Sequence, residues 1–103
     1  ALLEEGVDCT AIFAISDSLA IGAVRALIDA GKRVPMDISV AGFDGTEMAA
    51  YYNPSITTIR QPAETMARET IKLLFDSIKK KTNVQQLIFE GELVPGESVK
   101  KLN

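Results

Sequence analysis

The sequence Ala-Ile-Phe-Ala-Ile-Ser-Asp-Ser, residues 11–18, carries the pattern that decides the fold. Its apolar part has the length of a strand, and a continuous apolar run is typical of a parallel-sheet strand that is covered on both faces. The run ends at Ser16-Asp17-Ser18, where any of these side chains could cap a helix. Helical periodicity then continues to Ala30, and Gly31 is its expected stop. The stretch therefore predicts a strand that leads directly into a largely buried helix over 18–30.

The same alternation of strand and helix continues along the chain. The apolar stretch 38–43 and the β-branched stretch 56–59 predict the second and third strands. Helices are expected over 46–52 and over 62–80, because Thr46 can cap the first and Pro62 suits the first turn of the second. This order predicts an α/β fold with an open, largely parallel sheet flanked by helices.

The two ends of the chain are expected to be less regular. Residues 1–5 read as the end of a helix, since Gly6 suits the left-handed position that follows one. A chain that begins in the last turn of a helix is expected to be a segment of a longer protein. Residues 86–94 predict one or two short strands interrupted at Gly91, and residues 98–102 predict a fraying end.

The composition argues against several classes of function. The chain has 11 basic and 14 acidic residues and a net charge of −3, whereas nucleic-acid binding usually needs a basic face. It has no histidine, and the single Cys9 allows neither an internal disulfide nor a multi-thiolate metal site. Phosphate loops, nucleophile elbows and metal-ligand spacings are absent from the sequence. We therefore expect a non-enzymatic chain with no cofactor and no metal, and no apolar run approaches the roughly 20 residues that span a membrane.

Polar side chains follow each of the first three predicted strands, at Ser16-Asp17-Ser18, Asp44-Gly45 and Arg60-Gln61. Ligands of open parallel sheets bind outside the carboxyl ends of the strands, which share one edge. A carboxylate at this edge can accept hydrogen bonds from a polyol, and hydroxyl and amide groups can both donate and accept. The pattern therefore favours a site for a small polar ligand.

Structural roles for the same residues remain open at this point. Asp17 could serve as the N-cap of the 18–30 helix, and Asp44 could belong only to a turn. Gln61 could be only a cap or a hinge residue. Tyr51 and Tyr52 are more typical of packing or subunit contact than of ligand stacking.

Three stretches of the sequence resemble motifs of one family, the LacI/GalR-type bacterial transcription regulators. Residues 11–23 resemble the family pattern AIFxxND-xxAxGA, residues 34–44 its VPxDISVxGFD signature, and residues 53–62 its xPxLTTIxQP segment. The three occur in the family's order and spacing, and together they cover nearly the whole chain.

The resemblance implies a periplasmic-binding-protein-like sensor of two subdomains, with a small polar effector, sugar or nucleoside-like, in the cleft between them. It implies a cytoplasmic homodimer that binds operator DNA through a separate N-terminal helix-turn-helix, which this chain lacks. Residues 1–60 and about 84–103 would then belong to the C-terminal subdomain. The helix within 61–83 would belong to the other subdomain.

The resemblance also implies roles for individual residues. The implied effector contacts are Asp44, Ser16, Gln61 and Asp17, and Ser16 stands where the family often has asparagine. The segments that match the family's subunit interface contain Leu19, Gly22, Ala23, Ala26, Tyr51 and Tyr52. Small residues on one side of the 18–30 helix are consistent with this, because they allow another helix to approach closely.

Two other functions fit the same sequence. A sugar-binding protein of a transporter would share the fold and could use the same Gly42–Thr46 segment. A dimerisation module whose cleft no longer binds ligand would share the subunit-contact residues. The 53–62 segment favours the regulator.

Overall fold

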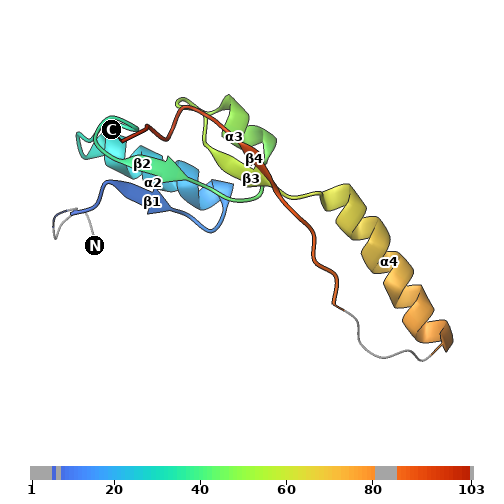
Figure 1. Ribbon diagram of the computed structural model, residues 1–103. Coiled ribbons are helices and arrows are strands. Elements are labelled where there is room, and N and C mark those ends of the chain that lie inside the picture. The colour runs from blue at the N-terminus through green and yellow to red at the C-terminus, as the bar shows by residue number, and fades with distance from the viewer. Residues whose placement is uncertain (1–5, 7, 81–85, 103) are drawn as a thin grey trace. The chain divides into compact units, whose positions relative to one another are not determined.

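The computed structural model describes residue 6, residues 8–80 and residues 86–102. In chain order its elements are β1 (Ala11–Phe13), α2 (Asp17–Asp29), β2 (Ser39–Ala41), α3 (Glu47–Tyr51), β3 (Thr58–Arg60), α4 (Ala63–Lys80) and β4 (Glu92–Val94) (Figure 1). The chain divides into two compact units, residues 1–60 with 93–103 and residues 61–92. The predicted helix end at residues 1–5 lies outside the described residues. None of the helices within the described ranges is long and apolar enough to cross a membrane.

The first unit is built on parallel strand pairing. Strand β1 pairs in parallel with β2, and two further parallel bridges, Ala41–Thr57 and Asp44–Arg60, join the β2 segment to the β3 segment. Strands β3 and β4 form a second two-stranded sheet. The predicted α/β fold with a largely parallel sheet is confirmed, although the strands are shorter than their apolar runs.

The core of this unit lies between α2 and the sheet. Helix α2 turns its Ala20, Val24 and Leu27 side inward, and these side chains are at most 2% exposed. They share the core with buried residues from the strands and from α3, namely Ala14, Ile38, Val40, Ala49 and Ile56. Positions 20, 24 and 27 follow the spacing of three and four residues that places side chains on one helix face.

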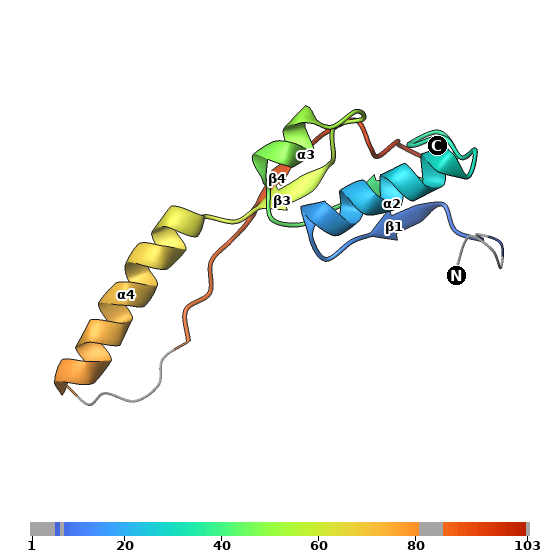
Figure 2. The same cartoon turned by 180° about the vertical axis from the view of Figure 1, so that it is seen from behind.

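Within the first unit, helix α2 covers one face of the β1–β2 sheet. Seen from behind, α2 lies in front of β2, and β1 is visible beside the helix (Figure 2). Side chains alternate between the two faces of a strand, so Ile12 packs against the core while Phe13 faces away and is 65% exposed. Ile15 is 76% exposed. The expectation that the first strand is covered on both faces is therefore wrong for the described residues, although the apolar run itself is a strand.

Helix α4 forms most of the second unit and is amphipathic. Its large apolar side chains recur at intervals of three and four residues, as predicted, and Ile71, Leu74, Phe75 and Ile78 are 54–66% exposed. Glu64 and Arg68 form an exposed ion pair one turn apart, 3.0 Å between Oε1 and the guanidinium. Residues 86–91 contain no strand, so the predicted strand region 86–94 reduces to β4.

The C-terminal segment does not fray, contrary to the expectation for residues 98–102. Ser98 is fully buried, and its carbonyl accepts a hydrogen bond from Val40 N at 2.9 Å. Its hydroxyl donates to the Val40 carbonyl and accepts from Thr57 N at 2.9 Å. Lys100 N also donates to Ser39 Oγ at 3.1 Å. The segment is therefore fastened across β2 and the start of β3, which explains why a polar sequence is ordered here.

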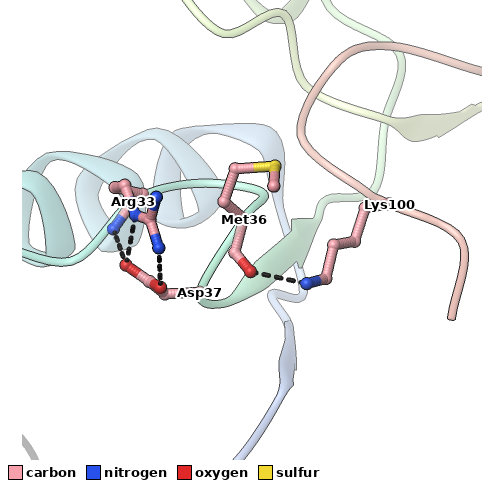
Figure 3. A network of polar contacts seen from close by, with 4 residues as sticks. All are labelled: Arg33, Met36, Asp37 and Lys100. Atoms are coloured by element: carbon pink, nitrogen blue, oxygen red, sulfur yellow. Dashed lines mark hydrogen bonds and ion pairs between the residues drawn. The ribbon is translucent and has the colours of Figure 1, made fainter.

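A polar turn joins α2 to β2. The guanidinium of Arg33 donates to both carboxylate oxygens of Asp37, at 3.1 and 2.9 Å, and Arg33 N donates to the same carboxylate at 2.7 Å (Figure 3). Side-chain hydrogen bonding from Arg33 lowers the pKa of Asp37 from 3.8 to about 2. Lys100 Nζ donates to the carbonyl of Met36 at 2.6 Å, so the C-terminal segment also holds this turn (Figure 3).

Candidate functional site at the carboxyl edge of the parallel strands

Ser16 is the N-cap of α2. Its backbone is extended, with φ −148° and ψ 159°, and its Oγ accepts a hydrogen bond from Leu19 N at 3.2 Å. The cap is the last residue before helical backbone angles begin, and here that residue is Ser16. The suggestion that Asp17 caps this helix is therefore wrong: Asp17 is already the first helical residue, and its side chain points elsewhere.

The Asp17 side chain is buried, with 1% of its surface exposed, and both of its carboxylate oxygens accept hydrogen bonds. Oδ2 accepts from the backbone N–H of Thr46 at 2.7 Å and from the Thr46 hydroxyl at 2.9 Å. Oδ1 accepts from the Thr58 hydroxyl at 2.6 Å. The same Thr58 oxygen accepts from Gly45 N at 3.2 Å. Asp17 therefore joins the start of α2 to the segment after β2 and to β3.

Gly42 gives the Asp17 carboxylate the space that it occupies. A Cβ added at Gly42 would lie 2.6 Å from Asp17 Oδ1 and 3.1 Å from the Ala20 Cβ. The distance to Asp17 Oδ1 is shorter than real Cβ atoms show, and Asp17 and Ala20 are both buried. A residue without a side chain at position 42 is therefore required for the carboxylate to reach Thr46 and Thr58 at once.

Asp44 lies just beyond β2, in an unusual backbone conformation. Its φ is 126°, the only positive φ of a described residue other than glycine. Its N–H donates to the carbonyl of Ile59 at 2.9 Å, and it forms a parallel bridge with Arg60. Its side chain is exposed. Strained backbone of this kind persists only where neighbouring contacts impose it, and it concentrates at functional sites.

Gly45 continues the turn with φ 75° and packs directly on β3. A Cβ at this position would lie 2.5 Å from the Arg60 Cα and 2.6 Å from the Arg60 Cβ. The predicted Asp44-Gly45 turn is thus present, and it is a tight one that is pressed against the neighbouring strand. A turn and a ligand-binding role are compatible for Asp44, because its carboxylate lies at the surface.

Gln61 is the first residue of the second unit and is half-buried. Its carbonyl accepts a hydrogen bond from Ala63 N at 2.8 Å, where α4 begins. Ser16 is also half-buried. Of the four predicted ligand residues, Ser16, Asp17 and Asp44 belong to the first unit, and Asp17 directly contacts the turn that contains Asp44.

The residues predicted for a subunit interface divide by exposure. Leu19 is 56% exposed and Tyr51 is 81% exposed, and Gly22 and Ala26 are also exposed on α2. Ala23 and Tyr52 are half-buried and pack against the core. The exposed face of α2 is therefore distinct from the Ala20-Val24-Leu27 face that packs on the sheet.

A small cavity adjoins the turn. It measures about 140 Å³, and its lining includes Gly45, Thr46, Thr58, Arg60 and Val94. Binding pockets for small molecules usually measure about 300–1,000 Å³. The described residues of this unit therefore offer an edge with polar groups and only a small cavity beside it. They contain no cluster of three or more His, Cys, Asp or Glu side chains that could hold a metal ion.

Sequence reasoning missed the roles of Thr46 and Thr58. Thr46 does occupy the N-cap position of α3, but its side chain makes no cap hydrogen bond and turns to Asp17 instead. Thr58 was interpreted only as a β-branched strand residue. Its spacing of two from the buried Ile56 was the available signal, because it places a hydroxyl on the buried face, where a polar partner is required.

Comparison with known proteins identifies the family. The model of one protein family, the periplasmic binding protein-like domain, matches residues 2–99 of this chain. The chain belongs to this family. It is 48% identical over 97 residues to the HTH-type transcriptional regulator MalR of Clostridium butyricum, an alignment that covers 94% of this chain and 29% of MalR.

Comparison with solved structures gives transcription regulators as well. The transcriptional regulator CelR in complex with cellobiose matches with a TM-score of 0.86 and 39% identity, over 94% of this chain and 30% of that one. The Lac repressor dimer bound to operator and the anti-inducer ONPF matches with a TM-score of 0.87 and 32% identity, over 95% and 34%. The resemblance to LacI-type regulators is thereby confirmed. The chain spans about three tenths of the length of these relatives, in their C-terminal part.

Proposed function

We propose that this chain is the effector-sensing and dimerisation part of a longer, cytoplasmic, LacI-type transcription regulator. A small polar ligand, a sugar in the first instance, would bind in a cleft between two subdomains and change how the regulator binds operator DNA. The observation that carries the proposal is Asp44: its exposed carboxylate follows a parallel strand, in a backbone conformation that its neighbours impose. The relative whose structure is a complex with cellobiose supports a sugar as the ligand class.

On this proposal Asp44, Ser16 and Gln61 contact the ligand. The Asp44 carboxylate accepts hydrogen bonds from sugar hydroxyls, and hydrogen bonds to a charged group are the stronger ones. Residues 1–60 and the C-terminal segment form one wall of the cleft. The remainder of the regulator supplies the other wall, in keeping with the small size of the cavity beside the turn.

Helix α4 is assigned to the second subdomain. Its exposed Ile71, Leu74, Phe75 and Ile78 stripe supports this, because burying side chains of this size stabilises a protein by about 1.5–3 kcal/mol each. The exposed face of Phe13 and Ile15 is expected to be covered by other parts of the same regulator.

The mechanism follows from population shift. A ligand that binds the closed cleft better than the open one favours the closed form, and the coupling between two such sites is typically about 1–3 kcal/mol. Paired DNA-binding heads must match the spacing of two operator half-sites. A change in subdomain angle, carried through the dimer, would therefore alter operator affinity.

The exposed side of α2 supplies the proposed subunit contact. Leu19, Gly22 and Ala26 are exposed there, with Tyr51 exposed on α3. Small residues let the backbone of a partner helix approach closely, and the aromatic ring can add apolar area at the edge of the contact. Ala23 and Tyr52 would support the interface from beneath.

The test is calorimetric titration of the full-length regulator with cellobiose, maltose and guanosine. We expect at least one of these to bind, and Asp44→Ala to weaken that binding by roughly 10- to 100-fold, because about 1.5–3 kcal/mol is lost with hydrogen bonds to a charged group. Glu47→Ala is the matched control, since it removes an exposed carboxylate only three residues away. The control should bind like the wild type.

Operator binding is measured in parallel by gel shift, with and without the ligand that binds. The proposal requires Asp44→Ala to respond only at a higher ligand concentration while its operator affinity without ligand stays unchanged. Equal ligand affinity in wild type and Asp44→Ala would remove Asp44 from the site.

A further inference from the structure

We propose that Asp17 is a positioning residue of the effector site: it acts by fixing the turn that carries Asp44, and it does not touch the ligand. The inference rests on the proposed function, and it replaces the direct ligand contact that the resemblance implied for Asp17. The buried carboxylate is the first reason. With 1% of Asp17 exposed and three hydrogen-bond donors on its two oxygens, the side chain faces the protein interior.

The hydrogen-bond partners of the Asp17 side chain lie on the segment that follows Asp44 and on strand β3. Thr46 is held directly, through its backbone N–H at 2.7 Å and its hydroxyl at 2.9 Å. Gly45 is held indirectly, because its N–H donates to the Thr58 hydroxyl oxygen, and that hydroxyl donates to Asp17 at 2.6 Å. The residues just after Asp44 are therefore bound to Asp17 by a short polar chain.

Asp44 needs this restraint because of its backbone. A φ of 126° is unfavourable for any residue with a Cβ, and such a conformation relaxes unless the surroundings over-determine it. On the preceding side, Asp44 N is bonded to the Ile59 carbonyl at 2.9 Å. On the following side, the Asp17–Thr46 and Thr58–Gly45 bonds complete the restraint. Without them the turn can rotate, and the carboxylate of Asp44 then moves.

Gly42 gives independent support for the arrangement. A Cβ at this position would lie 2.6 Å from Asp17 Oδ1 and 3.3 Å from the Asp17 Cα. The strand segment therefore lacks a side chain at the one place where a side chain would push the Asp17 carboxylate away from its donors. The clasp formed by Asp17, Thr46 and Thr58 thus also depends on Gly42, which contributes no hydrogen bond to the clasp and donates its own N–H to the Thr57 carbonyl at 2.9 Å.

The clasp also links two proposed ligand contacts from separate segments. Ser16 precedes Asp17 in the chain and caps α2, while Asp44 lies two residues before Thr46. A bond between Asp17 and Thr46 therefore fixes the separation of the Ser16 hydroxyl from the Asp44 carboxylate. Binding groups need to be held within about 0.5 Å of their productive positions, and such positions are usually set by residues behind them.

The test uses the full-length regulator with Asp17→Asn and, as a second variant that keeps the side-chain shape, Thr58→Val. Amide hydrogen exchange is measured at Gly45 and Thr46, and affinity is titrated with cellobiose and maltose as probes. We expect exchange at both amides to accelerate by about tenfold, since a charge-assisted bond is lost, and probe affinity to fall by a similar factor. Ser98→Ala controls for stability, because it removes buried hydrogen bonds of the same unit without touching the clasp. It should leave the affinity within about twofold.

A double-mutant cycle separates positioning from direct contact. Because Asp17 acts through Asp44, Asp17→Asn should add less than about twofold to the affinity loss of Asp44→Ala. Full additivity would mean that Asp17 contributes on its own, and the positioning role would be rejected. Unchanged affinity in Asp17→Asn, where Asp44→Ala does weaken binding, would reject it as well.

The failure of the proposed function is recognised separately. Asp44→Ala would then bind both probes as the wild type does, or neither probe would bind. In that event the effector-site role of Asp17 falls with the proposed function, and the exchange measurement decides only whether Asp17 fixes the turn: unchanged exchange at Gly45 and Thr46 overturns that part as well, and faster exchange upholds it.

Discussion

The buried hydroxyl of Ser98 offers a sharp test of what holds the first unit together. Ser98 is fully buried, and its Oγ both donates to the Val40 carbonyl and accepts from Thr57 N at 2.9 Å. The substitution Ser98→Ala removes one oxygen atom and both bonds. It leaves the backbone bond from Val40 N to the Ser98 carbonyl in place.

The expected loss follows from the two groups left behind. A net contribution of about 0.5–1.5 kcal/mol is typical of one hydrogen bond, while a buried donor that loses its partner costs about 1–3 kcal/mol. The Thr57 N–H is such a donor, whereas a carbonyl oxygen tolerates the loss of one bond better because it has two lone pairs. We therefore expect Ser98→Ala to lower the free energy of unfolding by about 2–4 kcal/mol.

Urea unfolding followed by circular dichroism measures this difference. The midpoint should fall while the slope with denaturant stays the same, because the surface exposed on unfolding hardly changes. Ser18→Ala is the matched control: it is the same chemical change at an exposed position of α2 and should shift stability by no more than about 0.5 kcal/mol. If Ser98→Ala behaved like Ser18→Ala, the hydroxyl would contribute nothing and the account of the C-terminal segment given above would be refuted.

Three further outcomes are expected. Gly22→Glu should abolish the proposed dimer in analytical ultracentrifugation without lowering the melting temperature, because a Cβ there meets no described atom within 4 Å, its own helix backbone aside; a dimer that persists would count against this face. Leu27→Ala should cost about 2–5 kcal/mol in urea unfolding while Leu19→Ala costs less than about 0.5 kcal/mol, since the first side chain is 2% and the second 56% exposed. The pKa of Asp37 is lowered from 3.8 to about 2 by its bonds to Arg33, so its stabilisation is present above pH 3.8 and is lost as the pH falls towards 2. The stability difference between wild type and Asp37→Asn should therefore be present at pH 5 and should close near pH 2; a difference that did not change with pH would contradict the assigned cause.

The sequence predicted the order of strands and helices because that order depends on local periodicity. The apolar run at residues 11–15, the glycine at position 31 and the stripe on α4 each act within a few residues of their own element. The edge that carries Asp44 could be predicted for the same reason, since parallel strands place their carboxyl ends together. Nothing more than the alternation of strand and helix was needed.

Two of the wrong predictions concern residues whose partners are distant in the chain. Asp17 was proposed as a helix cap because its neighbours in sequence suggested one, whereas its donors are 29 and 41 residues away. The C-terminal segment was expected to fray because it is polar, yet Ser98 bonds to residues 41 and 58 positions earlier. The role of a buried polar side chain is determined by its hydrogen-bond partner. When that partner is distant in the chain, local sequence pattern cannot identify it.

Helix α2 brings the separate proposals into one physical arrangement. Its N-terminus carries Ser16 and Asp17 at the proposed effector edge, and its inner side, with Val24, is fixed on the sheet. Its outer side carries Gly22 towards the proposed partner subunit. A helix of 13 residues is about 20 Å long and stiff, so its ends move together. Effector binding that shifts Ser16 or the clasp would therefore be transmitted along α2 to the subunit contact, and displacements of only about 1–2 Å at such contacts are known to switch allosteric proteins. This arrangement predicts that substitutions on the exposed side of α2 change the ligand concentration needed to alter operator binding, even though they lie outside the ligand site.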